Sequence, residues 1–197
     1  MGDDVGRGLA HIAALATLLV GPVAARATDV GPTSQAAFRD EILRYLGLAK
    51  EETQSMRFVE LERSRDAALA QALGEGLTFE GWLLELRGIE PTPGGGYFVR
   101  FMDPALVDHR SARPTYWNGG PGRITSQAAI RPGSALYEVL KVMKPGTKIT
   151  VAGNFFPNAN GGPVFESAQL NYRENSAALA KFRAPYFAIR VTGIRPP

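Results

Sequence analysis

The stretch that most constrains the fold is Thr147–Phe155, in which apolar and polar residues alternate. Ile149, Val151 and Phe155 fall on one side of an extended chain, and the residues between them fall mostly on the other. This period of two is typical of a β-strand that turns one face to a core. We therefore expect a strand here and organise the rest of the chain around it.

A short helix is predicted directly before this strand. Pro132 and Gly133 interrupt the chain, and Pro145 and Gly146 end the segment that follows. At its start, Ser134 is suited to be the N-cap. One helical face of this segment would carry Leu136, Tyr137, Leu140 and Met143. The sequence thus predicts a helix that leads straight into a strand.

Composition favours one globular domain with a real core, with or without an appendage. The chain has 197 residues, of which 45% are hydrophobic. Its net charge is +3, from 22 basic and 19 acidic residues that are interspersed, whereas proteins held by phosphate contacts usually carry a denser basic stripe. The chain has no cysteine, which excludes disulfides, thiolate metal sites and cysteine nucleophiles.

Residues 1–27 have the pattern of a secretory signal peptide. Leu9–Val20 is largely apolar but short for a transmembrane helix, and the residues up to Ala27 fit the small-x-small cleavage pattern. We expect cleavage after Ala27, a periplasmic or secreted protein, and no membrane span after cleavage. Nucleic acid is then not an expected partner. The alternative is an uncleaved anchor or a misassigned start, because Asp3 and Asp4 stand where positive charge is usual.

Residues 28–76 are expected to form a helical segment ahead of a β-rich body. Helices are predicted over Gln35–Leu46 and from about Glu51 to Leu73, each ended by a glycine. Both carry an apolar stripe, which usually packs on a core. The alternative is an arm that docks a partner, or a second copy of the chain in a homodimer through helices 35–73.

Residues 77–197 carry strand patterns separated by turns rich in glycine and proline. The predicted strands are Leu77–Glu90, Tyr97–Met102, Arg123–Ile130, Thr147–Phe155, Val164–Leu170 and Tyr186–Ile194. Asp103–Gly122 is expected to be a long loop, and one helical turn is expected near Ala177–Phe182. Gly81, inside the first strand, indicates a bulge or a sharp bend.

The order strand, strand, strand, helix, strand, strand, with one further strand, resembles the OB-fold, a partly open five-stranded Greek-key barrel. The resemblance covers Leu77 to about Ile194 and rests on this order and on the bend at Gly81. The chain is similar in the same way to small exported bacterial OB-fold proteins. The expected fold is mainly β (α+β), an OB-like barrel with a helix between its third and fourth strands, preceded by a helical hairpin. The alternative is another small barrel or sandwich built from the same strands.

The sequence shows no recognisable catalytic or metal-binding set. After removal of the leader, His109 is the only histidine, and its neighbours Asp108 and Ser111 do not make a triad merely by adjacency. One histidine without cysteine cannot build a zinc site. The glycine clusters lack the context of a phosphate loop, and no carboxylates are spaced as a glycosidase pair. We expect no catalytic residue, no metal and no cofactor; the alternative is an enzyme whose site the fold assembles from residues that the sequence does not show together.

The resemblance implies a ligand-binding face. OB-folds bind extended ligands across strands two and three and the loops beside them. On this chain the surface would comprise Tyr97, Phe98, Arg100, Tyr116, Trp117, Arg123, Gln127, Asn158 and Asn160. Aromatic rings beside arginines can stack on sugars, bases or other flat groups. Both sides of Tyr97–Met102 are apolar, so the pattern leaves open which one faces outward. An alternative role for Trp117 is to pin its own long loop.

Three functions follow from this interpretation. The favoured one is a non-catalytic exported binding domain for an envelope ligand such as a glycan, a peptide or a protein. The second is a structural or assembly protein that docks a partner through its amino-terminal helices. The third is an OB protein that binds single-stranded nucleic acid, which requires that the leader is not cleaved.

Overall fold

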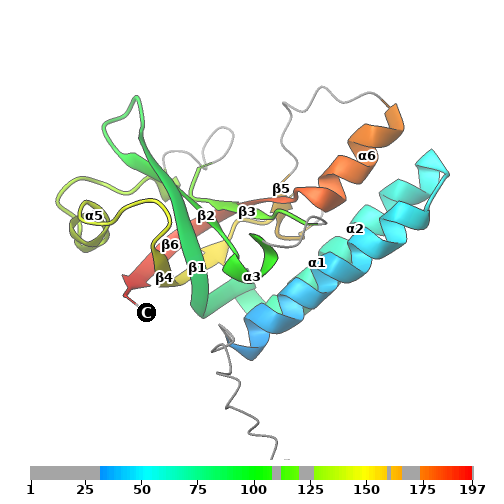
Figure 1. The fold of residues 1–197 in the computed structure, drawn as a ribbon, viewed down its shortest axis with the longest axis horizontal. Helices are drawn as coiled ribbons and strands as arrows, with labels where there is room; N and C mark the ends of the chain where they lie inside the picture. The colour runs from blue at the N-terminus through cyan, green and yellow to red at the C-terminus, as the bar shows by residue number, and fades with distance from the viewer. Residues whose placement is uncertain (1–31, 108–111, 120–126, 159–160, 166–173, 197) are drawn as a thin grey trace, which may run out of the picture.

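The computed structural model describes residues 32–107, 112–119, 127–158, 161–165 and 174–196 (Figure 1). The expected signal peptide of residues 1–27 with its expected cleavage point, His109, and the site candidates Arg123 and Asn160 lie outside these ranges. The elements are α1 (Thr33–Glu51), α2 (Ser55–Leu73), η1 (Glu75–Leu77), β1 (Thr78–Pro91), β2 (Tyr97–Met102), α3 (Pro104–Val107), β3 (Thr115–Trp117), α5 (Ala135–Leu140), β4 (Lys148–Phe155), β5 (Val164–Phe165), α6 (Glu174–Arg183) and β6 (Tyr186–Arg195).

Five of the strands close a barrel. The sheet order is β3-β2-β1-β4-β6-β5, and β3 also pairs with β6, so that β1, β2, β3, β6 and β4 form a ring. The β3–β6 pair is parallel, and the other pairs of the ring are antiparallel. With α5 between β3 and β4, this is the small OB-like barrel that the sequence predicts.

The barrel interior is filled by alternate residues of each strand. On β2, Val99 and Phe101 are fully buried, whereas Arg100 between them is exposed. This alternation is the pleat of a strand with one face in a core. The question that the sequence leaves open is thereby answered: Phe98 and Arg100 lie on the outer face of β2.

The predicted bend in the first strand is confirmed. The register between β1 and β4 shifts between Phe79 and Trp82, and Gly81 between them has φ 71°. A glycine adopts this left-handed conformation without the steric cost that a side chain adds. The bulge re-aims the strand so that Trp82 lies fully buried in the core.

The helix before β4 is also confirmed. The Ser134 hydroxyl accepts a hydrogen bond from the backbone N–H of Tyr137 at 3.2 Å, as an N-cap does. The last residue of α5, Leu140, is buried in the core cluster. In Figure 1 this helix lies on the side of the barrel away from α1, α2 and α6.

Helix α1 packs on the barrel through aromatic side chains. The Phe38 ring lies 5.1 Å from that of Trp82, 5.3 Å from that of Phe155 and 5.2 Å from that of Phe187, measured between centroids. Helices α2 and α6 pack beside α1, and the turn between α1 and α2 lies at the end far from the barrel (Figure 1). The apolar stripe of the first predicted helix is therefore buried against the barrel.

The predicted third strand is wrong in its position. Strand β3 occupies Thr115–Trp117, inside the segment that the sequence assigns to a loop. Of Arg123–Ile130, residues 127–130 are described, and among these only Ile130 pairs with a strand, through one bridge to Tyr97.

A side chain explains this difference. The carboxamide of Asn118 accepts a hydrogen bond from the Val99 N–H and donates to the carbonyl oxygens of Tyr97, at 3.3 Å, and Ala128, at 2.9 Å. It is fully buried. Asn118 thus supplies hydrogen-bond partners to the backbone of β2 at the place where a longer third strand would have paired with β2.

Two helices extend beyond their predicted bounds. Helix α1 continues through Gly47 to Glu51, because Ala49 is buried in the core cluster, and such burial offsets the roughly 1 kcal/mol that a glycine costs a helix. The helical turn expected near Ala177–Phe182 is the full helix α6. Within the described ranges, no helix is both long and apolar enough to cross a lipid bilayer.

Candidate functional site

The outer face of β2, β3 and β6 carries a row of three aromatic side chains. The Trp117 ring lies 5.2 Å from that of Phe98 on one side and 5.3 Å from that of Tyr186 on the other, in edge-on geometry. All three are half-buried. The row therefore crosses three neighbouring strands and leaves part of each ring accessible.

Strand register places these side chains together. Trp117 is paired with Arg100 in the antiparallel β2–β3 ladder, so that both point outward beside Phe98. In the parallel β3–β6 ladder Thr115 is paired with Tyr186. Since paired residues share a face of the sheet, the row continues onto β6.

An ion pair borders the row. The guanidinium of Arg100 contacts the carboxylate of Glu90, which is paired with Phe98 across the β1–β2 ladder. The two side chains are 50% and 48% exposed.

Burial raises the pKa of the Tyr186 phenol, the charge of Glu90 raises it further, and Arg100 opposes them. Tyr186 is thus a neutral hydroxyl at physiological pH, close to both charges.

Trp117 is held tightly by its own chain. A Cβ atom added at Gly119 would run into the indole ring, so the backbone passes directly over it. The indole Nε1 is buried and has no hydrogen-bond partner among the described residues. This is the packing that the loop-pinning alternative expects, although one edge of the ring still takes part in the row.

Two of the predicted aromatic residues lie elsewhere. Tyr116 is in the barrel core, 1% exposed, with its ring stacked on that of Phe187 at 5.2 Å. Its side chain points away from the outer face and does not reach a ligand there. Tyr97 directly precedes Phe98 but points to the opposite face of β2, toward α5, where its ring is 5.3 Å from that of Tyr137.

Two polar candidates also lie apart from the row. Gln127 is exposed and accepts a hydrogen bond from Arg190 at 3.5 Å. Asn158 donates to the carboxylate of the buried Asp66 at 2.5 Å and accepts from the Gly162 N–H at 3.0 Å. Asn158 thus ties the loop after β4 to helix α2.

Of the nine candidates, the structure brings together Phe98, Arg100 and Trp117. It adds two residues that the sequence does not indicate, Tyr186 and Glu90. Both lie at strand ends and join the row only through pairing between strands, which no local pattern shows.

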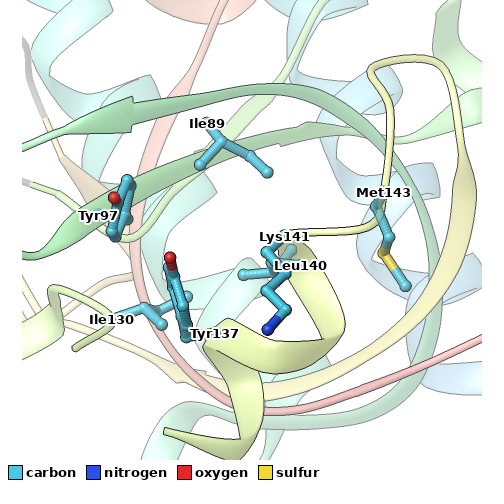
Figure 2. A pocket seen from close by; sticks show the side chains of 7 residues that line it. All are labelled: Ile89, Tyr97, Ile130, Tyr137, Leu140, Lys141 and Met143. Atoms are coloured by element: carbon cyan, nitrogen blue, oxygen red, sulfur yellow. The ribbon is translucent and has the colours of Figure 1, made fainter. Parts of the chain in front are cut away.

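A separate cavity of about 260 Å³ lies between α5 and the strands β1 and β2 (Figure 2). Four of its lining side chains are apolar: the aliphatic Ile89, Ile130 and Leu140, and Met143 with its thioether. The others are Tyr97, Tyr137 and Lys141. Figure 2 shows Tyr97 and Ile89, on the strands, across the cavity from the side chains of α5.

A second cavity, of about 320 Å³, lies between α2 and Gly161–Gly162. Its lining includes Asp66, whose carboxylate already bonds to Arg65 at 3.0 Å and to Asn158. Within the ranges that the structure covers, no group of three or more histidine, cysteine, aspartate or glutamate side chains is arranged to hold a metal ion.

No protein-family model, no curated protein and no solved structure matches this chain. The candidate site therefore rests on the geometry of these residues and on the barrel that carries them.

Proposed function

We propose that this chain is a non-catalytic binding protein that holds an oligosaccharide across the outer face of β2, β3 and β6. We further propose that it acts in the cell envelope once the leader is removed. The observation that supports this is the aromatic row of Phe98, Trp117 and Tyr186 beside the Arg100–Glu90 pair. Two of its three rings, Phe98 and Trp117, lie on β2 and β3, the strands that OB barrels use for oligosaccharides and oligonucleotides.

The chemistry of the face favours a sugar chain. Partly exposed rings offer apolar surface to the C–H faces of sugar rings, and the phenol of Tyr186 with the charged groups of Arg100 and Glu90 offers hydrogen bonds to hydroxyl groups. At the aromatic row itself, the charge of Arg100 is matched by that of Glu90. A nucleic-acid groove instead needs unmatched positive charge along the backbone path.

The test begins with the chain from Thr28 applied to an array of bacterial envelope oligosaccharides, with the strongest hit then titrated by calorimetry. We expect Arg100→Gln to weaken binding about tenfold, the effect of one lost hydrogen bond to a charged group. Arg44→Gln is the matched control, because Arg44 is 51% exposed, pairs with one glutamate and lies on α1. Equal loss in both variants contradicts the proposed face, as does salt-dependent preference for a single-stranded oligonucleotide.

A second candidate function, assembly through the helical hairpin, is favoured by one observation. Three large apolar side chains near the turn between α1 and α2 are exposed: Leu48 (41%), Met56 (85%) and Val59 (50%). We infer that this tip would be the contact in a homodimer. Size-exclusion chromatography with light scattering should then show a dimer that Met56→Glu dissociates. A wild-type chain that is monomeric would contradict the homodimer.

A further inference from the structure

The cavity beside α5 has an aromatic wall and an aliphatic floor. The rings of Tyr97 and Tyr137 lie 5.3 Å apart and are inclined by 34°. Ile89, Leu140 and Met143 line the same cavity (Figure 2). Aromatic rings and a thioether sulfur both interact favourably with an aromatic guest, so this lining suits a flat ring.

The charge of the cavity is asymmetric. Among the residues that line it, Lys141 alone carries a formal charge at neutral pH. Its ammonium pairs with Glu138, which does not line the cavity, and the two side chains are 48% and 49% exposed. Exposed pairs of this kind are weak. A guest carboxylate can therefore share the ammonium, whereas a guest cation would meet the repulsion of that ammonium.

The phenols supply hydrogen-bond donors at the same place. The electrostatic interaction with Tyr97 and the hydrogen bond between the two phenols raise the pKa of Tyr137, so the Tyr137 hydroxyl stays protonated at neutral pH. A protonated phenol can donate to a carboxylate oxygen. Donors and a positive charge thus stand beside an apolar pocket of about 260 Å³.

We propose that this cavity is a binding site for a small aromatic carboxylic acid, with its ring against Tyr97 and Tyr137 and its carboxylate at Lys141. The site lies on the α5 side of the barrel and is separate from the outer face of β2, β3 and β6. Its test therefore does not depend on whether that face binds a sugar.

The test uses 2-naphthoate and its uncharged analogue 2-naphthamide, titrated into the ¹⁵N-labelled chain from Thr28. We expect naphthoate to shift the amide signals of Ile89, Tyr97 and Tyr137, with a dissociation constant of about 1 mM or tighter. Lys141→Gln should weaken naphthoate about five- to tenfold and leave naphthamide nearly unchanged. Lys144→Gln, an exposed lysine three positions later that does not line the cavity, is the matched control and should change neither.

A cavity-filling variant tests the location. Met143→Trp should abolish binding of both compounds, and Ile89→Phe serves the same purpose if the first variant does not give a folded spectrum. The proposal is overturned if about 5 mM naphthoate leaves the cavity signals unmoved. It is equally overturned if naphthamide binds the wild type as tightly as naphthoate, or if the filled variants bind as well as the wild type.

Discussion

The carboxamide of Gln35 pairs with the main chain of Leu83 as a neighbouring strand would. Its Nε2 donates to the Leu83 carbonyl at 2.8 Å, and the Leu83 N–H donates to its Oε1 at 2.9 Å. The same Nε2 lies 3.2 Å from the buried carboxylate of Asp103, which also accepts from Arg39. Helix α1 is thus hydrogen-bonded to the edge of β1 by a side chain that is 1% exposed.

Gln35→Leu should destabilise the fold by about 1–3 kcal/mol, because it leaves the partly buried N–H and carbonyl of Leu83 without partners. Urea denaturation followed by circular dichroism measures the change. Gln71→Leu is the control, since Gln71 is exposed on α2 and its replacement should cost less than about 0.5 kcal/mol. Similar midpoints for the two variants would show that α1 is not anchored through this amide.

Asn118→Asp should make stability depend on pH. The new carboxylate keeps an acceptor for the Val99 N–H but faces the carbonyl oxygens of Tyr97 and Ala128, to which the amide donates. This raises the pKa of the carboxyl in the folded variant above its unfolded value of about 3.9. Relative to the wild type, the free energy of unfolding of the variant should therefore be highest below about pH 3.9. It should fall as the pH rises from there through the raised pKa of the folded variant.

The measurement is the free energy of unfolding of Asn118→Asp and of the wild type at about pH 3.5 and about pH 7. We expect the difference between the two proteins to widen at the higher pH. A constant difference would mean that the side chain does not bridge β2 and the segment at Ala128.

Gly153→Ala should destabilise the barrel where β4 meets β6. A Cβ at this position would collide with the backbone carbonyl of Arg190 and with the Phe79 ring. Overpacking of this kind costs about 1–3 kcal/mol. The neighbouring Gly193→Ala is the control, since its Cβ would meet the Ala152 methyl at an ordinary 3.5 Å. Thermal denaturation should separate the two, and equal melting temperatures would refute the close approach.

Tyr116 should make the protein sensitive to alkali. Burial, and then the charge of Asp103, raise the pKa of its phenol well above the usual value, with Arg39 opposing. In the unfolded chain this phenol ionises near pH 10, whereas in the folded chain it stays neutral. Its contribution to stability is thus intact below about pH 10 and is lost above it, by up to about 1.4 kcal/mol per pH unit.

Tyr116→Phe removes this titration. Its free energy of unfolding should fall less steeply than that of the wild type between about pH 10 and about pH 11.5. Parallel curves for the two proteins would show that the phenol ionises equally well in both states.

The barrel could be predicted because its strongest signals are local. The alternation in Thr147–Phe155, the cap at Ser134 and the glycine at position 81 each determine the conformation of their own segment. Strand β3 could not be found in this way, because three residues cannot display a period and the carboxamide of Asn118 replaces its continuation.

The candidate site was predictable only in part, for a related reason. Phe98 and Arg100 follow from the alternation of β2 and the resemblance to an OB barrel. Tyr186 joins them through the parallel pairing of β3 with β6, two strands far apart in sequence. Whether Tyr116 points into the barrel depends on which residues of β3 face inward. This is set by the pairing of β3 with β2 and β6.

The most direct test of the proposed function is a chemical-shift map of the ¹⁵N-labelled chain titrated with the strongest oligosaccharide from the array. If the outer face is the site, the largest shifts fall on Phe98, Arg100, Trp117 and Tyr186, and they vanish in Phe98→Ala. Shifts confined to the helices α1 and α2, or to the surroundings of Tyr137, would contradict it.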